Sequence, residues 1–295
     1  MIDTMTTVIN KLVIIGVGLI GGSFALALRR VGKVKHIVGI GRSTQNLHAA
    51  IELQVIDEIA TDPARALHQA DMVFLGMPVA QTAHTLEQIA PYLQANTIIT
   101  DAGSTKQDVI AAARHHLPMA NRHHFVPGHP IAGAELSGVK AAQADLYHNK
   151  HVILTPLAET SIDAVKRVEQ LWQACGASVS HMSADEHDRI LAITSHLPHI
   201  LAFTMMNHIR HSTPEPEQLL RFAGSGLRDF TRIAGSSPEM WRDICLANRE
   251  TLIKQIDAYR DELLILQKLL HEKDGEALQQ TFMSARALRG DWLKP

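Results

Sequence analysis

The segment Gly128-His129-Pro130-Ile131-Ala132-Gly133-Ala134-Glu135 sets one histidine among glycines and a proline, which fix the backbone around it. An imidazole has an unperturbed pKa of about 6.5, so His129 is suited to remove a proton from an alcohol at neutral pH. A histidine that precedes a proline in a turn can also serve only to hydrogen-bond the backbone. From the residues alone, both interpretations of His129 stay open.

A second segment, Asp101-Ala102-Gly103-Ser104-Thr105-Lys106, directly follows a predicted strand. The carboxyl ends of parallel strands are where open sheets bind ligands, so Ser104 is placed to hydrogen-bond a substrate hydroxyl or a catalytic imidazole. Asp101 or Ser104 can equally cap a helix that begins at Thr105. The two roles are compatible.

Arginines are concentrated in a third region, which runs from Gly226 to Ile233 and on to Ile244. A guanidinium beside a glycine-rich turn makes a good carboxylate clamp, because its planar fork binds two oxygens at once. The alternative is ion pairing among Arg228, Asp229, Arg242 and Asp243, and we expect it for at least two of these charges.

Asp188, Ser195 and His199 are spaced i, i+7 and i+11 in a predicted helix, which places them within a stripe of roughly 40° on one face. We expect Pro198 to bend this helix just before His199. The stripe is interpreted as the lining of a pocket, and a set of satisfied polar groups in the core is the alternative.

An apolar run that ends at Ile15 leads into the turn Gly16-Val17-Gly18-Leu19-Ile20-Gly21 and then a predicted helix. This spacing is typical of dinucleotide sites: the first glycine allows the turn, the second lets the backbone approach a pyrophosphate, and the third lets the helix pack on the strand. We assign cofactor binding to Gly16, Gly18, Leu19, Ile20 and Gly21.

The acid that usually binds the ribose 2′-hydroxyl of NAD, about 20 residues further on, is missing, since no Asp or Glu occurs between Gly21 and Glu52. Arg42 follows the second predicted strand and can oppose a 2′-phosphate, with Ser43 beside it as a hydroxyl donor. We therefore expect NADP to be preferred, with NAD as the other possibility. Otherwise Arg42 is a solvated loop cation.

Apolar runs alternate with amphipathic stretches up to residue 181, which predicts an α/β fold with a doubly wound, Rossmann-type parallel sheet covered by helices. The predicted strands are Leu12–Ile15, His36–Ile40, Met72–Gly76, Thr97–Thr100, Phe125–Pro127, Val152–Thr155 and Ser178–His181. Ser183 and Glu186 form a capping-box pattern, after which every segment is helical in pattern. We place a dinucleotide-binding domain at 1–182 and an all-α substrate and dimerisation domain at 183–295.

The composition limits the partners. With 28 basic and 30 acidic side chains, the chain gives no indication of nucleic acid or an anionic membrane surface, and no segment is apolar for long enough to span a membrane. Its two cysteines and 18 histidines show no metal-ligand spacing, so no metal is expected. We expect a cytoplasmic enzyme with a small-molecule substrate. It should form a homodimer, because the helical half is too apolar to stand alone.

Taken in order from Leu12 to about Asn248, these segments resemble the prephenate and arogenate dehydrogenase family of tyrosine biosynthesis. The resemblance is carried by Gly16-Val-Gly-Leu-Ile-Gly-Gly-Ser23, Asp101-Ala-Gly-Ser-Thr-Lys106, Gly128-His-Pro-Ile-Ala-Gly-Ala-Glu135, Ser195-His-Leu-Pro-His199, Arg228-Asp-Phe-Thr-Arg232-Ile-Ala and Met240-Trp-Arg-Asp243.

The resemblance implies an oxidative decarboxylation, in which a hydride passes to the nicotinamide and the ring carboxylate leaves as CO₂. By the family pattern His129 accepts the proton of the ring hydroxyl and Ser104 orients that hydroxyl or the imidazole. Arg232 clamps a substrate carboxylate, and the remaining substrate-binding residues implied are His199, Glu135, Asp188 and Trp241. The sequence does not distinguish prephenate from arogenate.

Other functions remain open at this stage. A β-hydroxyacid or hydroxyacyl-CoA dehydrogenase also joins a dinucleotide domain to a helical one. A nucleotide-sensing module that has lost its chemistry would keep the same fold.

Overall fold

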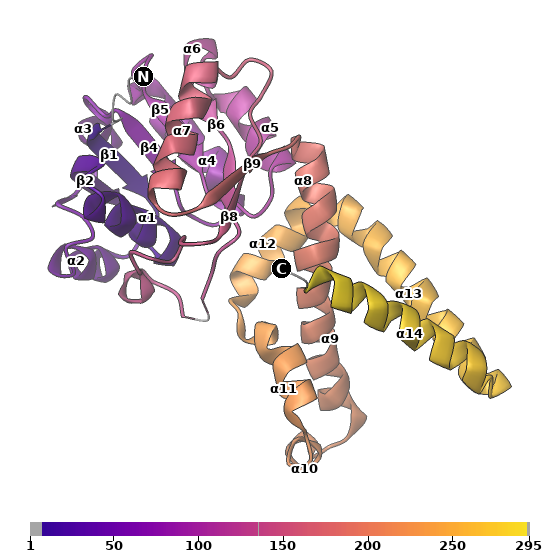
Figure 1. Ribbon diagram of the computed structural model, residues 1–295. Helices are drawn as coiled ribbons and strands as arrows, with labels where there is room; N and C mark the ends of the chain where they lie inside the picture. The colour runs from indigo at the N-terminus through magenta and orange to yellow at the C-terminus, as the bar shows by residue number, and fades with distance from the viewer. Residues whose placement is uncertain (1–7, 135, 294–295) are drawn as a thin grey trace. The chain divides into compact units, whose positions relative to one another are not determined.

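A computed structural model of the chain describes residues 8–134 and 136–293. The chain divides into two compact units, Met1–Asn248 and Arg249–Pro295. The first contains the sheets and the helices around them, and the second is a pair of helices (Figure 1).

The first unit is built on a six-stranded sheet with the strand order β3-β2-β1-β4-β5-β6. All of its neighbouring strands are parallel, which confirms the predicted Rossmann-type fold. Its strands are β1 (Ile9–Ile15), β2 (Val34–Ile40), β3 (Glu58–Ile59), β4 (Met72–Leu75), β5 (Ile98–Asp101) and β6 (Phe125–Val126).

Successive side chains of a strand point to opposite faces, and the sheet consequently has two cores. Leu12 and Ile14 of β1 belong to one core, and Val13 and Ile15 belong to the other. On the first face the aromatic ring of Phe24 stacks on that of Phe74, with ring centroids 4.5 Å apart. Helices therefore cover both faces of the sheet (Figure 1).

The helices of this half are α1 (Leu19–Arg30), α2 (Thr44–Glu52), α3 (Pro63–Leu67), α4 (Thr82–Ile89), α5 (Gln107–His116), α6 (Met119–Arg122) and α7 (Ile162–Ala174). Helices α1 and α7 contribute to the first core, and α3, α4 and α5 contribute to the second. The Tyr147 hydroxyl also ties a later loop to α1, because it donates a hydrogen bond of 2.6 Å to the Ile20 carbonyl.

One part of the predicted sheet is wrong. The strands β8 (His151–Leu154) and β9 (Ser178–His181) do not join the large sheet but form a second one with β7 (Gly128–Pro130), which runs antiparallel to β8. Pro127 separates β6 from β7 and has no N–H group to donate to a ladder. The chain therefore leaves the first sheet at Pro127 and begins the second with His129 in its first strand.

After β9 the first unit is helical, as predicted. Its helices are α8 (Ala184–Leu191), α9 (Leu197–Ser212), α10 (Pro216–Leu220), α11 (Ser225–Thr231) and α12 (Pro238–Ala247). The Ser183 side chain accepts a hydrogen bond from the Glu186 N–H, which confirms the predicted N-cap of α8. Helix α11 begins at Ser225 with Gly224 as its N-cap.

A π-helical turn, Ala192–His196, joins α8 to α9. Pro198 at the start of α9 lacks an N–H and cannot bond to the carbonyl four residues earlier, so a wider turn ahead of it is physically reasonable. The structure shows a change of helix type directly ahead of Pro198, and the predicted bend stays a prediction. The turn changes the helical periodicity between Asp188 and His199, so the shared face of Asp188, Ser195 and His199 stays a prediction.

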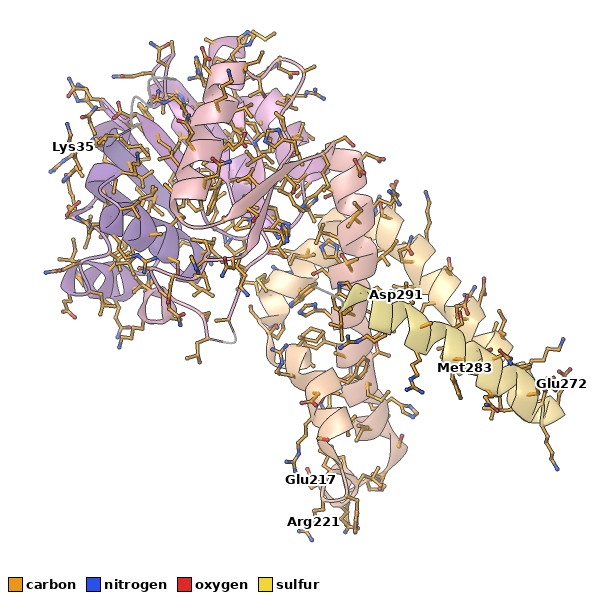
Figure 2. All side chains as sticks on the ribbon, in the orientation of Figure 1. Lys35, Glu217, Arg221, Glu272, Met283 and Asp291 are labelled. Atoms are coloured by element: carbon orange, nitrogen blue, oxygen red, sulfur yellow. The ribbon has the colours of Figure 1, made fainter. Side chains whose placement is uncertain are left out.

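The second unit consists of α13 (Arg249–Glu272) and α14 (Gly275–Trp292), which contact each other. Many of its large apolar side chains are exposed, including Leu263, Leu264, Phe282 and Met283. Figure 2 labels Met283 on α14 and Glu272 at the end of α13. Among the described residues, no helix combines the length and apolarity needed to cross a bilayer.

Candidate active site

The glycine turn after β1 has the backbone that a pyrophosphate needs. Gly16 has a φ of +95°, and a Cβ added to it would lie 2.6 Å from the Gly76 carbonyl carbon. A Cβ on Gly21 would lie 2.5 Å from the Gly16 oxygen, so α1 packs on the turn only because Gly21 has no side chain. A Cβ added to Gly18 would have no heavy atom within 4 Å among the described residues other than its chain neighbours. The turn therefore fits a dinucleotide, with open space where the phosphates approach the N-terminus of α1.

Arg42 and Ser43 follow the end of β2, where a 2′-phosphate would be expected. Both residues are exposed. The Ser43 oxygen accepts a hydrogen bond of 3.2 Å from the Asn46 N–H and so caps α2, while its O–H stays able to donate. The Asn46 side chain donates to the Val17 carbonyl at 2.6 Å, which ties this loop to the glycine turn.

His129 is half-buried in β7 and touches a second imidazole. Its Nδ1 lies 2.8 Å from Nε2 of His187, and the two rings cross at 61° with centroids 5.0 Å apart. His187 is fully buried, and its Nδ1 lies 2.7 Å from the Asp188 Oδ1. The three side chains form one chain of hydrogen bonds, from the α8 carboxylate to the β7 histidine.

The Asp188 carboxylate also accepts hydrogen bonds from the start of α5. The Lys106 N–H donates to its Oδ1 at 2.8 Å and the Gln107 N–H donates to its Oδ2 at 2.9 Å. The cap of α5 thus comes from a distant helix, and the expectation that Asp101 or Ser104 caps it is wrong. The helix begins at Gln107, because the residues before it form the turn that presents those N–H groups.

A buried ion pair lies under the same turn. The Lys106 ammonium and the Asp101 carboxylate form a short contact, and both side chains are almost fully buried. Lys106 Nζ also donates to the Gly128 carbonyl at 2.9 Å, and the Gly128 N–H donates to the Asp101 Oδ1 at 3.0 Å. Gly128, the residue before His129, is therefore held at both of its backbone polar groups.

The environment of these groups favours neutral imidazoles and an ionised carboxylate. Burial lowers the pKa of His129 well below its usual value, and the nearby His187 and Lys106 act in the same direction. Burial also lowers the pKa of His187, although its bond to Asp188 opposes the shift. Burial by itself would raise the pKa of Asp188, but its hydrogen bonds to His187 and to the start of α5 outweigh that effect and lower it.

A second group of rings lies along α9 and α12. The His199 imidazole stacks on the Trp241 ring with centroids 3.7 Å apart, and its Nδ1 lies 2.9 Å from the Ser195 carbonyl. Burial lowers the pKa of His199, and the Arg232 guanidinium nearby adds to the shift. Arg232 lies at the end of α11, in the 3₁₀ turn Arg232–Gly235, and it is exposed.

His196 connects the two groups. Its ring and that of Trp241 are nearly perpendicular, with centroids 6.0 Å apart. Its Nδ1 lies 3.2 Å from the side-chain amide nitrogen of Asn248, and that nitrogen also donates to the Asp188 carbonyl at 2.7 Å. Burial lowers the pKa of His196 to about 4, and the Asp188 carboxylate and the Ser104 backbone oppose that shift. Ser104 is half-buried in the loop between β5 and α5.

The structure brings His129 and Asp188 into the first group and stacks His199 on Trp241 in the second. Asp188 is buried with its oxygens bound by protein donors, so nothing in its setting supports direct contact with a substrate. Glu135 lies outside the described residues. Of the four charges with an ion-pair alternative, Arg242 and Asp243 do pair, with Nη2 and Oδ1 2.6 Å apart.

Sequence reasoning did not identify His187 and Lys106. The partner of His187 lies 58 positions earlier and no local spacing marks His187, whereas Lys106 stands in the same segment as its partner Asp101. A weak signal was present for Lys106, because a lysine directly after a strand and a glycine turn is well placed to enter the sheet edge. Among the described residues, no cluster of three or more His, Cys, Asp or Glu side chains is arranged to hold a metal ion.

The chain is similar to known proteins over nearly its whole length. Residues 24–181 match the family described as prephenate dehydrogenase, nucleotide-binding domain, and residues 183–284 match its dimerization domain. A prephenate dehydrogenase of Bacillus subtilis is 38% identical over 95% of this chain and 75% of its own. A cyclohexadienyl dehydrogenase of Zymomonas mobilis is 34% identical over 96% of each chain.

A solved structure has the same fold. The crystal structure of prephenate dehydrogenase from Aquifex aeolicus, in complex with hydroxyphenyl propionate and NAD⁺, superimposes with a TM-score of 0.90 at 36% identity. The match covers 96% of this chain and 98% of that one.

Proposed function

Because the chain belongs to the prephenate dehydrogenase family, we propose that it catalyses the oxidative decarboxylation of prephenate, arogenate or both in tyrosine biosynthesis. The products are 4-hydroxyphenylpyruvate from prephenate and tyrosine from arogenate. The observation that carries the proposal is the neutral His129 imidazole, held by a hydrogen-bonded partner beside the edge of a sheet whose first turn fits a dinucleotide.

The bound nicotinamide supplies the hydride acceptor. His129 removes the proton of the hydroxyl on the carbon that loses the hydride, so the O–H bond breaks, an N–H bond forms and the oxygen becomes a carbonyl. The ring carboxylate then leaves as CO₂, and its bonding electrons complete the aromatic ring while the carbonyl oxygen becomes a phenolate, which takes the proton back from His129 to give the phenol. Because aromatisation is strongly favourable, a base and a well-held substrate are the main requirements of the site.

The other predicted residues bind and orient the substrate in this proposal. Arg232 binds a substrate carboxylate through its guanidinium fork. The stacked pair of His199 and Trp241 lines the pocket, and Glu135 contributes at the side-chain end. Ser104 orients the reacting hydroxyl or the His129 imidazole. For Asp188 we propose no contact with the substrate but a role in orienting His129 through His187.

We further propose that NADP is preferred over NAD. The support is Arg42 at the end of β2, together with the absence of an acid between Gly21 and Glu52. Arg42 and Ser43 would bind the 2′-phosphate, and Gly16, Gly18, Leu19, Ile20 and Gly21 would hold the pyrophosphate.

We also retain the division into a dinucleotide-binding domain at 1–182 and a helical domain at 183–295, and the assembly as a homodimer. The match of residues 183–284 to a family dimerization domain and the exposed apolar side chains of α13 and α14 support that assembly.

The test is one set of initial-rate measurements in which both substrates are combined with both cofactors, with reduction of the nicotinamide and release of CO₂ followed together. The expected result is that at least one substrate gives equal amounts of reduced nicotinamide and CO₂. Its kcat/KM should be higher with NADP than with NAD. His129→Asn should lower kcat by about 10²-fold or more with the fold intact. The assignment is contradicted if the wild-type protein turns over neither substrate, or if His129→Asn leaves turnover nearly unchanged.

A further inference from the structure

We propose that His187 is a positioning residue, which together with Asp188 fixes the tautomer of His129 so that Nε2 of His129 presents a lone pair to the substrate hydroxyl. The inference rests on the proposed function of His129 as the base. It is carried by the chain of contacts from Asp188 through His187 to His129, with distances of 2.7 and 2.8 Å.

The Asp188 carboxylate determines which nitrogen of His187 carries the proton. Asp188 accepts hydrogen bonds from two backbone N–H groups at the start of α5, and these bonds stabilise its ionised form. An ionised carboxylate has no proton to donate. The proton in the contact between the Asp188 Oδ1 and His187 must therefore be on Nδ1 of His187.

The tautomer of His187 in turn determines which nitrogen of His129 carries the proton. A neutral His187 with its proton on Nδ1 has a lone pair on Nε2 and can only accept there. Nδ1 of His129 lies 2.8 Å from that lone pair, so it must be the donor. A neutral His129 with its proton on Nδ1 carries its remaining lone pair on Nε2, which is the atom that accepts the hydroxyl proton.

The arrangement also helps during the reaction. When Nε2 of His129 takes the hydroxyl proton, the ring becomes an imidazolium whose Nδ1–H still donates to His187. The buried Asp188 carboxylate stabilises this positive charge through His187, whereas the Lys106 ammonium opposes it. The His196 imidazole also lowers the pKa of His129, and Asp101 balances the Lys106 charge. His187 itself acts with burial to keep the pKa of His129 low, so the hydrogen bonds offset only part of that shift and leave the Nδ1–H of His129 in place as the donor.

Substitutions of His187 separate this role from simple packing. An amide at Gln length reaches the place of the imidazole Nε2 and can present an oxygen to His129, whereas an amide at Asn length reaches only the place of Nδ1. His187→Asn and His187→Leu should lower kcat by about 10-fold or more, with KM changed less than twofold. His187→Gln should recover most of that loss. His115→Gln, at an exposed histidine on α5, is the control.

A double variant gives a second readout. In a background of His129→Asn, where no imidazole remains to be oriented, His187→Leu should lower kcat no further. A general disturbance of the fold would lower kcat by the same factor in both backgrounds.

The tautomer can be observed without turnover. In protein labelled with ¹⁵N-histidine, the signals lost in His129→Asn identify His129. Its two-bond couplings should show a protonated Nδ1 and an unprotonated Nε2 in the wild type, and a mixture of tautomers in His187→Leu. This result holds whatever the substrate proves to be, so it separates the failure of this inference from a failure of the proposed function.

Three outcomes would overturn the inference: a wild-type His129 protonated on Nε2, equal kcat values for His187→Gln and His187→Asn, or a further loss of kcat on adding His187→Leu to His129→Asn. The wild-type spectrum needs no variant of His187, so the inference remains open to refutation even if those variants fold poorly.

Discussion

The buried pair of Lys106 and Asp101 should matter far more to stability than any surface ion pair of this chain, and Lys106→Met tests that expectation. The substitution keeps the length and the apolar stem of the side chain but removes its charge. It leaves the Asp101 carboxylate buried with only backbone donors, and it takes a donor from the Gly128 carbonyl.

The size of the effect follows from the burial. The side chains of Lys106 and Asp101 are 0% and 3% exposed, so water cannot replace the missing ammonium. Removing one partner of such a pair costs about 3–5 kcal/mol. This corresponds to a rise of roughly 150- to 5,000-fold in the unfolding equilibrium constant.

The assay is equilibrium unfolding in urea, with all variants compared at one protein concentration because the stability of an oligomer depends on concentration. Arg114→Met is the matched control. It breaks the contact of Arg114 Nε with Glu159 at 3.2 Å, where the side chains are 54% and 25% exposed, and should cost about 0–1 kcal/mol. Adding Asp101→Asn to Lys106→Met removes the unpaired charge and should restore part of the stability, because one of the two oxygens that accept from backbone N–H groups becomes an NH₂ group. The reasoning is refuted if Lys106→Met loses no more than Arg114→Met.

Three further predictions concern catalysis. Arg232→Gln should mainly raise KM, because an amide cannot replace the charged fork, and an unchanged KM in steady-state kinetics would show that the carboxylate binds elsewhere. Arg42→Asp should shift the ratio of kcat/KM values from NADP toward NAD, and a retained preference for NADP would refute the role of Arg42. Burial lowers the pKa of His129, so the neutral base persists below pH of about 6.5 and kcat/KM should fall only when the pH drops through that lowered pKa; a decline at or above pH of about 6.5 would contradict this.

The parts of the fold that sequence patterns predicted are those with local causes. Central parallel strands are buried on both faces, so β1 and β4 are continuous apolar runs that are visible in the sequence. The glycine turn and the Ser183 cap are also local, and both were found. In contrast, β3 is two residues long, too short for any periodicity, and β7 was predicted as a loop because glycine and proline flank its histidine.

The parts of the site that were missed depend on contacts between distant residues. His129 was identified from its own glycine and proline neighbours. Nothing near His187 in the sequence shows that its ring meets a residue 58 positions earlier. Asp188 was singled out, but for a helical stripe that the π-helical turn interrupts. Its actual partners lie at the start of α5, and only the packing of α8 against α5 brings them together.

The cap that Asp188 provides for α5 has a consequence for biosynthesis. The carboxylate follows Lys106 by 82 residues, so at about 5–20 residues per second a ribosome makes it about 4–16 s after the N–H groups that it binds. During that interval the nascent nucleotide-binding half has a helix without its cap, and it also lacks His187, the hydrogen-bond partner of His129. A fragment that ends at residue 182 would remain in that state permanently. The half that binds the nucleotide therefore completes its fold only when the first helix of the following half has been made.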